Sequence, residues 1–387
     1  MARTTAREAA FFALDTYFRI GVFVDESLER FKSELSSRDF GLAYEIATGV
    51  VRRKNALDAL IKAHATMPKK RQEKVLLRMG LYQMLFLDRI PDFAIGDEMV
   101  GLAKKHTSSS FAKFLNAFLR NQASSCSLTD LSPLELLSYP DYYVECLTKA
   151  YGNDKALEIL ELGNTKVPLF VRDRQEQKMI EIEQEALDSY SKNPRYYIQN
   201  PAQFEVYSHL KNVLKSTPKA ALDLAASPGG KTVMLHDFFA KVSLYANDIS
   251  EKKVALLKEN LSKYGVLANV SVGSALDFSG DVLFDLIVVD APCSNSGCLY
   301  KCPEARWRLT KDDVAAHVQL QKKLLQKAYS LLSPGGVIWY STCSILPEEN
   351  EQVAACIPEL ELVSNIQVLP TKDGLEGGYG AVLRSKK

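Results

Sequence analysis

The regular alternation of short apolar segments with longer helical patterns constrains the fold of this chain more than any other feature. After Pro218, five apolar segments are predicted as strands: 220–226, 242–248, 268–272, 283–290 and 336–342. Helical patterns separate most of them, beginning at Gly230 and covering 251–265 and 311–332. This alternation predicts an open parallel sheet with helices on both faces. Because ligands bind such sheets at the C-terminal ends of the strands, polar motifs at those ends are candidates for a functional site.

The N-terminal part of the chain has a different pattern. Apolar residues recur there at a spacing of three and four, as at Ala9, Phe12 and Ala13, and strand signals are absent. The stretch Val75–Leu87 is apolar nearly all round, which is typical of the central helix of a small bundle. We therefore expect an all-α domain over 1–125.

Between these two patterns lies a segment with weaker signals. Residues 167–172 predict a short strand, and the acidic segment 175–191 predicts a helix. We interpret 126–200 as a linker with a small connecting subdomain, and 201–387 as the α/β domain.

The composition excludes several classes of protein. Of the 387 residues, 47% are hydrophobic and 25% are charged, as in folded globular proteins rather than disordered or fibrous ones. No run approaches the ~18 apolar residues of a membrane span, and the N-terminus has no signal-peptide pattern. Seven cysteines, an odd number, indicate free thiols in a reducing compartment. We therefore expect a cytoplasmic protein that does not contact a membrane.

Basic residues are concentrated in one segment, although the net charge of the chain is only +1. From Arg52 to Arg78 there are nine basic and two acidic residues, which gives a local net charge of +7. Such a segment is a candidate binding surface for a polyanion. A solvated helix face accounts for the same composition equally well.

The first polar motif, LDLAASPGGKT (222–232), runs from a predicted strand through a Gly-rich turn into a helix. Its GKT ending resembles a P-loop, and LIVVD (286–290) would then be the acidic strand that holds magnesium. A P-loop, however, needs glycine where this chain has Ala225, and Pro228 stiffens the turn. A turn that holds a nucleoside cofactor is the favoured interpretation.

Two aspartates at later strand ends extend this hypothesis. Asp248 follows Gly230 by 18 residues, close to the interval of about 20 residues at which an acidic residue binds ribose hydroxyls. Asp277, after the third strand, is placed to reach an adenine, although a surface or capping aspartate is the alternative.

The second and third motifs are DAPCSNSG (290–297) and STCS (341–344), each at a predicted strand end. If the two strands are neighbours, Cys293 and Cys343 point into the same crevice. A lone cysteine is most often a small buried hydrophobic residue. Two cysteines at strand ends, both flanked by polar residues, favour a reactive pair.

Zinc is a further alternative, because Cys293, Cys298 and Cys302 are spaced by four and three residues. A fourth ligand is lacking nearby, and the paired CxxC pattern of zinc sites is absent. We therefore expect no metal.

An aspartate and two cysteines beside a nucleoside cofactor suit one reaction, methylation of carbon 5 of cytosine. A thiolate that adds to C6 converts the ring into an enamine, which accepts a methyl group at C5. A carboxyl group can hold the N3/N4 edge of the base. Loss of the C5 proton and expulsion of the thiol then restore the ring, so the reaction needs a thiol of lowered pKa. The residues alone do not say which cysteine attacks.

These motifs resemble those of a known family, the RNA (cytosine-C5) methyltransferases of the Sun type. The successive stretches LDLAASPGGKT, ANDIS, VVDAPCSNSGCLYKCPEARWR and YSTCSILPEENE occur in the order of the family, and GGYGAVLR resembles its final strand. The helical part is similar to the NusB-like domain that precedes one branch, the bacterial 16S rRNA enzymes of the RsmB type. VLLRMGLYQMLFLDRIPDFAIGDEMVGLAKKH and KFLNAFLRNQ carry that similarity.

The resemblance implies a fold, a cofactor and a substrate. The expected fold is an α/β Rossmann-like S-adenosylmethionine-dependent methyltransferase domain preceded by an all-α NusB-like domain. The expected product is 5-methylcytosine in 16S rRNA, with tRNA as the alternative substrate. We expect RNA as the partner, no membrane, no metal and a monomeric enzyme. A P-loop NTPase and a non-catalytic RNA-binding or transcription factor are more remote alternatives.

The resemblance also implies roles for individual residues. Cys343 would be the nucleophile, Cys293 would help to release the product, and Asp290 would contact both cytosine and cofactor. The cofactor would be held by Ala225, Ala226, Ser227, Pro228, Gly229, Gly230, Lys231, Asp248, Asp277 and Asp290. Candidate RNA-binding residues are Arg52, Arg53, Lys54, Arg78, Arg306 and Arg308.

Three departures from the family pattern stand out. The cofactor loop usually begins Cys-Ala-Ala, where this chain has Ala225, Ala226 and Ser227. Arg174 replaces an asparagine that is common in the family. The segment 175–200 is short, which suggests an abridged RNA-binding subdomain.

Overall fold

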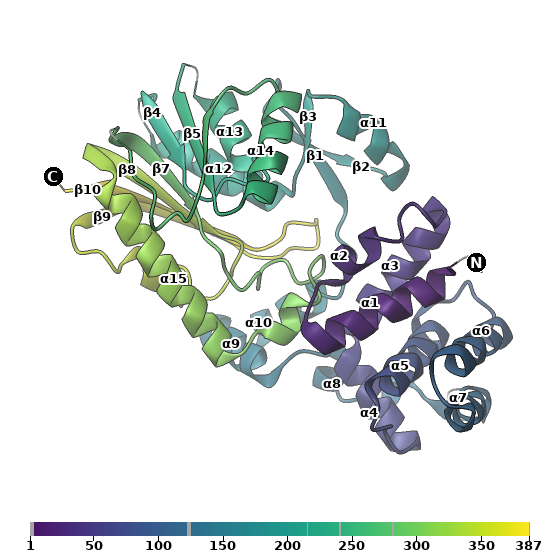
Figure 1. The fold of residues 1–387 in the computed structure, drawn as a ribbon. Helices are drawn as coiled ribbons and strands as arrows, with labels where there is room; N and C mark the ends of the chain where they lie inside the picture. The colour runs from purple at the N-terminus through teal and green to yellow at the C-terminus, as the bar shows by residue number, and fades with distance from the viewer. Residues whose placement is uncertain (1–3, 122–124, 215, 240, 281, 387) are drawn as a thin grey trace. The chain divides into compact units, whose positions relative to one another are not determined.

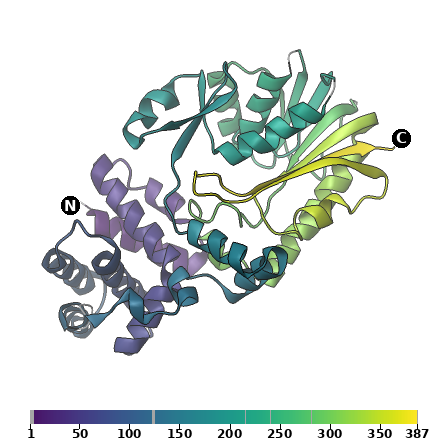
Figure 2. The same ribbon diagram turned by 180° about the vertical axis from the view of Figure 1, so that it is seen from behind.

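The computed structural model describes residues 4–121, 125–214, 216–239, 241–280 and 282–386. The chain divides into two compact units between Asp141 and Tyr142. The three-part division at residues 125 and 200 stays a prediction. Figure 1 labels the elements of both units, and Figure 2 shows them from behind.

Every regular element of the first unit, within its described residues, is helical, as the sequence predicts. The helices are α1 (Ala6–Ile20), α2 (Val24–Glu29), α3 (Ser37–Arg52), α4 (Lys54–His64), α5 (Arg71–Phe86), α6 (Asp92–His106), α7 (Ser109–Asn121), the short 3-10 helix η2 (Leu128–Asp130) and α8 (Pro133–Leu137). Nine consecutive residues of α5, from Val75 to Gln83, are buried. Because α5 contacts α1, α3, α4, α6 and α7, it is the central helix that its apolar sequence predicts.

The basic segment of this unit is largely occupied by internal contacts. Arg78 is buried and donates two hydrogen bonds to Asp58, at 2.7 and 2.9 Å. Lys54 lies 3.5 Å from the same carboxylate, and Arg52 is also buried. Arg53 donates to the Leu136 carbonyl oxygen at 2.9 Å. The expectation that Arg52 and Arg78 present their charges to a polyanion is therefore wrong, because folding removes both from solvent. The exposed lysines of the segment are Lys62, Lys69 and Lys70.

The second unit begins with two helices and a small antiparallel sheet. The helices are α9 (Asp141–Tyr151) and α10 (Asn153–Leu162). The sheet has the order β2-β1-β3, formed by β1 (Leu169–Asp173), β2 (Lys178–Ile182) and β3 (Tyr196–Ile198). The short helices η3 (Gln184–Ala186) and α11 (Leu187–Lys192) connect β2 to β3.

The helix predicted over 175–191 is therefore wrong over most of its length. Gln177 has a φ of +50°, which closes a hairpin, and Ile180 then pairs with Val171 across the two strands. The acidic composition favoured a helix, but the β-branched residues of β2 pack against β1 instead.

The main sheet of this unit has seven strands in the order β6-β5-β4-β7-β8-β10-β9. Its strands are β4 (Ala220–Asp223), β5 (Ser243–Asp248), β6 (Asn269–Val272), β7 (Phe284–Asp290), β8 (Leu332–Thr342), β9 (Leu360–Val368) and β10 (Gly378–Ser385). The five predicted strands occur and run parallel to one another. The sheet as a whole is mixed rather than parallel, because β10 pairs antiparallel with both β8 and β9.

Helices cover both faces of the seven-stranded sheet (Figure 1). They are α12 (Pro201–Val213), α13 (Gly230–Phe238) and α14 (Glu251–Lys263) on one face, and α15 (Lys311–Ser330) and α16 (Glu351–Ala354) on the other. Strand β8 shows why, since Val337 and Trp339 join the first core while Ile338 and Tyr340 join the second. None of the helices in the described ranges is long and apolar enough to cross a membrane.

A buried ionic cluster connects the small sheet to α13. Asp237 lies 2.7 Å from Arg172, whose side chain is fully buried, and accepts two hydrogen bonds from Arg174 at 2.7 and 3.0 Å. Arg174 also donates to the Tyr264 carbonyl oxygen at 3.1 Å. The arginine that departs from the family pattern thus has a structural partner in this chain.

Asp237→Ala should destabilise the second unit by about 3–5 kcal/mol, because it leaves the buried charge of Arg172 unpaired. Urea denaturation followed by tryptophan fluorescence measures this change, since Trp339 is buried in the same unit. The control is Asp188→Ala, which removes a carboxylate from an exposed pair with Lys192. We expect its denaturation midpoint to match wild type. Equal midpoints for all three proteins would show that the cluster does not stabilise the fold.

Candidate active site

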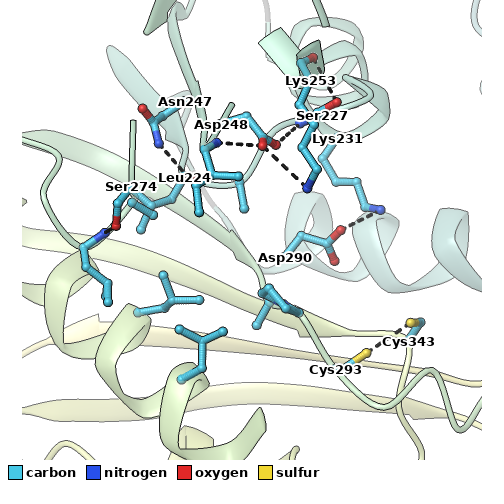
Figure 3. A pocket seen from close by; sticks show the side chains of 18 of the residues that line it. Leu224, Ser227, Lys231, Asn247, Asp248, Lys253, Ser274, Asp290, Cys293 and Cys343 are labelled. Carbon is cyan, nitrogen blue, oxygen red and sulfur yellow. Dashed lines mark hydrogen bonds and ion pairs between the residues drawn. The ribbon is translucent and has the colours of Figure 1, made fainter. Parts of the chain in front are cut away.

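A pocket of about 560 Å³ opens at the C-terminal ends of the parallel strands, as the topology predicts (Figure 3). Its walls come from the turn after β4, the ends of β5 and β7, and the loops that follow β6, β7 and β8. Side chains of four helices complete them: Gln203 of α12, Lys231 of α13, Lys253 of α14, and Leu320 and Leu324 of α15. The pocket lies entirely within the second unit.

The turn after β4 is fastened to its neighbours through the backbone. Ala226 donates to the Asn247 carbonyl oxygen at 2.8 Å, which ties the turn to the end of β5. Gly229 donates back to Ala226 at 2.6 Å and has a φ of +110°, a conformation that favours glycine. Helix α13 begins at the next residue, so the turn presents backbone to the pocket.

The predicted cofactor residues of this turn do not all reach the pocket. Ala225, Ser227 and Lys231 line it. The others, Ala226, Pro228, Gly229 and Gly230, shape the turn without lining this pocket.

Asp248 is brought into the pocket in the way the sequence predicts. Its carboxylate accepts hydrogen bonds from the backbone N–H groups of Ser227 at 2.9 Å and Ile249 at 2.7 Å. The side chain is nearly buried, and the Lys253 ammonium lies 3.7 Å away. Each carboxylate oxygen keeps a further acceptor site, which suits the two hydroxyls of a ribose.

Asp277, in contrast, lies outside the pocket. Its backbone N–H donates to the Ser274 carbonyl oxygen at 3.0 Å, and this turn leaves its side chain exposed. Ser274, Ala275 and Leu276 line the pocket in its place. The prediction that Asp277 reaches the cofactor is therefore not supported by this geometry.

Asp290 and Lys231 form an ion pair in the pocket, with 2.7 Å between Oδ2 and Nζ (Figure 3). The Ser341 hydroxyl donates to the other oxygen of Asp290 at 3.0 Å. Burial alone would lower the pKa of Lys231, but the Asp290 carboxylate outweighs it and raises that pKa, so the ammonium stays charged. Lys231 is thus engaged by a carboxylate rather than presented to phosphates as in a P-loop.

Asp223, at the end of β4, was not singled out in the sequence. It is fully buried behind the turn and accepts a hydrogen bond from the Thr232 hydroxyl at 2.7 Å. Burial raises the pKa of this carboxyl to about 7. Its place in LDLAAS, at the strand end, is the signal that could have identified it.

The two thiols meet, as expected if their strands are neighbours. Strands β7 and β8 pair in parallel with Asp290 opposite Ser341. The Sγ atoms of Cys293 and Cys343 lie 3.1 Å apart, and the Cys343 thiol donates to Asn295 Oδ1 at 2.8 Å. The Cys293 thiol is therefore the donor between the two sulfurs.

Both thiols are protonated in this arrangement. The contact with Cys343, together with burial, raises the pKa of Cys293. Cys293 lowers the pKa of Cys343, but Cys298 and burial outweigh this effect and raise it well above its usual value. Either thiol must therefore lose its proton before it can act as a nucleophile.

Cys293 lies in the loop after β7 and Cys343 in the loop after β8, and we call these two segments the thiol loops. Close backbone packing at Gly297 holds them together. Its N–H donates to the Cys343 carbonyl oxygen at 3.0 Å, and its carbonyl oxygen accepts from Gly377 at 2.8 Å. A Cβ at position 297 would lie 2.6 Å from the Cys343 oxygen and 2.7 Å from the Gly377 backbone. Only glycine permits this approach.

Arg306 and Arg308 were predicted to line the entrance for RNA. Arg306 is fully buried and donates to Asn164 Oδ1 and the Gly163 carbonyl oxygen, both at 3.1 Å. The prediction that Arg306 lines the entrance is therefore wrong, because its guanidinium hydrogen-bonds the residues that directly follow α10. Arg308 is exposed, and its role stays a prediction.

Two further polar residues near the thiols, Glu349 and Asn350, are fully buried and were not predicted to act in the site. The sequence signal that could have identified them is the polar stretch PEEN (347–350), which lies shortly after the STCS motif. For metals, the described ranges contain no group of three or more His, Cys, Asp or Glu residues that could hold an ion.

Gly297→Ala should lower the free energy of unfolding by about 1–3 kcal/mol, because its methyl group collides with backbone that cannot move aside. Gly280→Ala is the matched control, since a Cβ there meets nothing closer than 3.8 Å. Urea denaturation of both variants measures the difference. Equal stability of the two would mean that the thiol loops adapt to a larger residue.

Comparisons with known proteins agree with this geometry. Residues 212–382 match the family described as 16S rRNA methyltransferase RsmB/F, and residues 4–124 match the NusB family. The ribosomal RNA small subunit methyltransferase B of Pasteurella multocida is 31% identical over 403 residues, covering 91% of this chain and 89% of the relative. The protein of the same name from Vibrio cholerae is 29% identical over 423 residues, covering 97% and 96%.

A solved structure has a similar fold over two thirds of the chain. The methyltransferase homologue protein from Pyrococcus horikoshii is 25% identical, with a TM-score of 0.57, and the match covers 67% of this chain and 99% of that one. The resemblance seen in the motifs is confirmed, and the P-loop and non-catalytic alternatives are set aside. The chain belongs to the RsmB/F family of 16S rRNA methyltransferases, with an N-terminal NusB domain.

Proposed function

We propose that this chain methylates carbon 5 of a cytosine in 16S rRNA, with Cys343 as the nucleophile and Cys293 assisting release. Membership of the family makes the chain an S-adenosylmethionine-dependent RNA (cytosine-C5) methyltransferase. One observation carries the assignment of residues: two thiols 3.1 Å apart share a pocket with the Asp290–Lys231 pair and with Asp248. The names of the relatives favour 16S rRNA over tRNA.

The residues of the pocket fit S-adenosylmethionine. Asp248, with free acceptor sites on a carboxylate held by two backbone N–H groups, would bind the ribose. The apolar side chains of Leu224, Leu320 and Leu324 line the same pocket and would contact the adenine. When bound, the cofactor supplies an electrophilic methyl group carried on a positively charged sulfur.

Asp290 is held on both sides, by Lys231 and by Ser341, so its carboxylate is fixed in the pocket. In this position it accepts a hydrogen bond from the amino group of cytosine and supports protonation at N3. The proton that N3 takes up comes, through water, from the Cys343 thiol. Protonation makes C6 electrophilic, and the Sγ of Cys343 then forms a bond to C6 while the electron pair of the C5=C6 bond moves to C5. After C5 has been methylated, water takes the C5 proton and the electron pair of the C5–H bond reforms the C5=C6 bond. The Sγ–C6 bond breaks with its electron pair on sulfur, and the N3 proton returns through water to the Cys343 thiolate.

The remaining assignments belong to the same proposal. Residues 1–125 would form the domain that binds RNA, and residues 201–387 the domain that catalyses methyl transfer. Residues 126–200 would connect these two domains. The described cysteines are all free thiols, which supports a cytosolic location.

The rate of methyl transfer in a single turnover should rise with pH between 7 and 9. Because the pKa of Cys343 is raised, the thiolate fraction grows about tenfold per pH unit until that pKa is reached. The measurement uses radiolabelled cofactor, with enzyme in excess over RNA but below the dissociation constant for RNA, so that the rate reports the pKa of the free enzyme. Cofactor affinity is determined at each pH. A rate that stops rising below pH 8 would contradict the raised pKa.

The proposal is tested by transfer of radiolabelled methyl to total RNA from a strain that lacks this gene, followed by digestion and detection of 5-methylcytosine. We expect label in 16S rRNA. Label in tRNA alone would overturn the substrate, and absence of label in free and ribosomal RNA would overturn the activity.

Trapping of a covalent protein–RNA adduct should distinguish the roles of the two cysteines. Cys293→Ala should accumulate a covalent protein–RNA adduct, stable on a denaturing gel, because release fails. Cys343→Ala should form no adduct and lose transfer at least 100-fold. Cys356→Ala, a cysteine outside the pocket, is the control and should behave as wild type. Equal adduct from Cys293→Ala and Cys343→Ala would remove the division of roles.

A further inference from the structure

Glu349 holds the loop that carries Cys293. Its side chain is fully buried and accepts hydrogen bonds from both the N–H group of Ser294, at 2.9 Å, and the Ser294 hydroxyl, at 2.5 Å. Gln321 of α15 donates to the same carboxylate at 3.1 Å, and to the Pro292 carbonyl oxygen at 3.0 Å. The residues on both sides of Cys293 are thus tied to one glutamate and its glutamine partner.

Asn350, the next residue, holds the loop that carries Cys343. Its Oδ1 accepts from the Thr342 hydroxyl at 2.6 Å, and its Nδ2 donates to the Ser344 carbonyl oxygen at 3.0 Å. The residues on both sides of Cys343 are therefore tied to this asparagine. Glu349 and Asn350, which hydrogen-bond the two thiol loops, are therefore consecutive residues joined by one peptide bond.

The side chains of Glu349 and Asn350 differ in charge. Glu349 brings a carboxylate against the residue that follows Cys293, whereas Asn350 brings a neutral amide to the Cys343 loop. The Glu349 charge is one of the causes that raise the pKa of Cys293. A protonated Cys293 can donate a hydrogen bond to the sulfur of Cys343 as it leaves C6.

We propose that Glu349 and Asn350 are positioning residues that separate the roles of the two thiols. Glu349 keeps Cys293 in place as a hydrogen-bond donor for release, and Asn350 orients Cys343 for attack. This inference rests on the proposed function, because it assigns the origin of the division of roles between the same two cysteines.

The test compares Glu349→Gln, Asn350→Ala and the control Glu348→Gln, which changes the neighbouring glutamate of the same turn. Formation and decay of the protein–RNA adduct are followed by quenched single turnovers. We expect Glu349→Gln to slow decay at least tenfold while formation stays within about threefold of wild type. Asn350→Ala should slow formation at least tenfold, and Glu348→Gln should match wild type.

A second readout does not depend on RNA. Contact with Cys343 and burial raise the pKa of Cys293 most, and the Glu349 charge raises it further. Removing that charge should lower the pKa, so iodoacetamide should alkylate Cys293 at least twofold faster at pH 8 in Glu349→Gln than in wild type. Sequencing of the labelled peptides by mass spectrometry identifies the cysteine. Ser294→Ala, which keeps the charge but loses one hydrogen bond, should slow adduct decay without changing alkylation.

The outcomes separate this inference from the proposed function. Equal slowing of formation and decay in Glu349→Gln, or alkylation of Cys293 that matches Glu348→Gln, would reduce Glu349 to a purely structural role and overturn the inference. If Cys343→Ala still methylates RNA, the proposed function fails. The alkylation result then still decides whether Glu349 controls Cys293.

Discussion

The parallel pairing of β7 with β8 is the interaction on which the rest of the site depends. It places Asp290 opposite Ser341, so the two thiol loops leave the sheet from neighbouring points. Contacts of Gly297 with Cys343 and Gly377 then hold the loops against each other. A shift of one residue in this register would turn the side chains to the other face of the sheet and separate the thiols. Because helices cover both faces, such a shift would also move the side chains of β7 and β8 into the wrong core and disrupt the packing of both.

The two carboxylates of the pocket have partners of different kinds. Asp248 is held by backbone N–H groups, and Asp290 is held by the side chains of Lys231 and Ser341. In the proposed reaction, carboxylates that are already held by such partners would need little free energy of reorganisation when the reactants bind. Glu349 does not line the pocket, but its carboxylate holds the loop of Cys293 from behind the pocket wall.

The sequence was most informative where local patterns and topology agree. The strands β4 to β8 are short apolar runs that end in polar motifs, and the meeting of Cys293 with Cys343 follows from the neighbouring positions of β7 and β8. It was least informative where burial decides the structure. Residues 175–191 are acidic, yet Ile180 pairs across a hairpin. Glu349 follows the STCS motif closely, but its charged stretch is also typical of a solvated loop, and the fold decides that it is fully buried. Asp277 lies on an exposed turn outside the pocket, and its contact with the cofactor stays a prediction.

The basic residues show why charge in a sequence does not translate directly into charge on a surface. Folding pairs Arg78 with Asp58 and encloses Arg306 at the end of α10, so these guanidinium groups stabilise the two units instead of facing a ligand. The lysines that stay exposed in the first unit, such as Lys62 and Lys69, have flexible side chains. In the proposed reaction they would contribute affinity for phosphates that weakens with salt and carries no base preference. In the same proposal, recognition of cytosine would come from the pocket itself, which both Asp290 and Cys343 line.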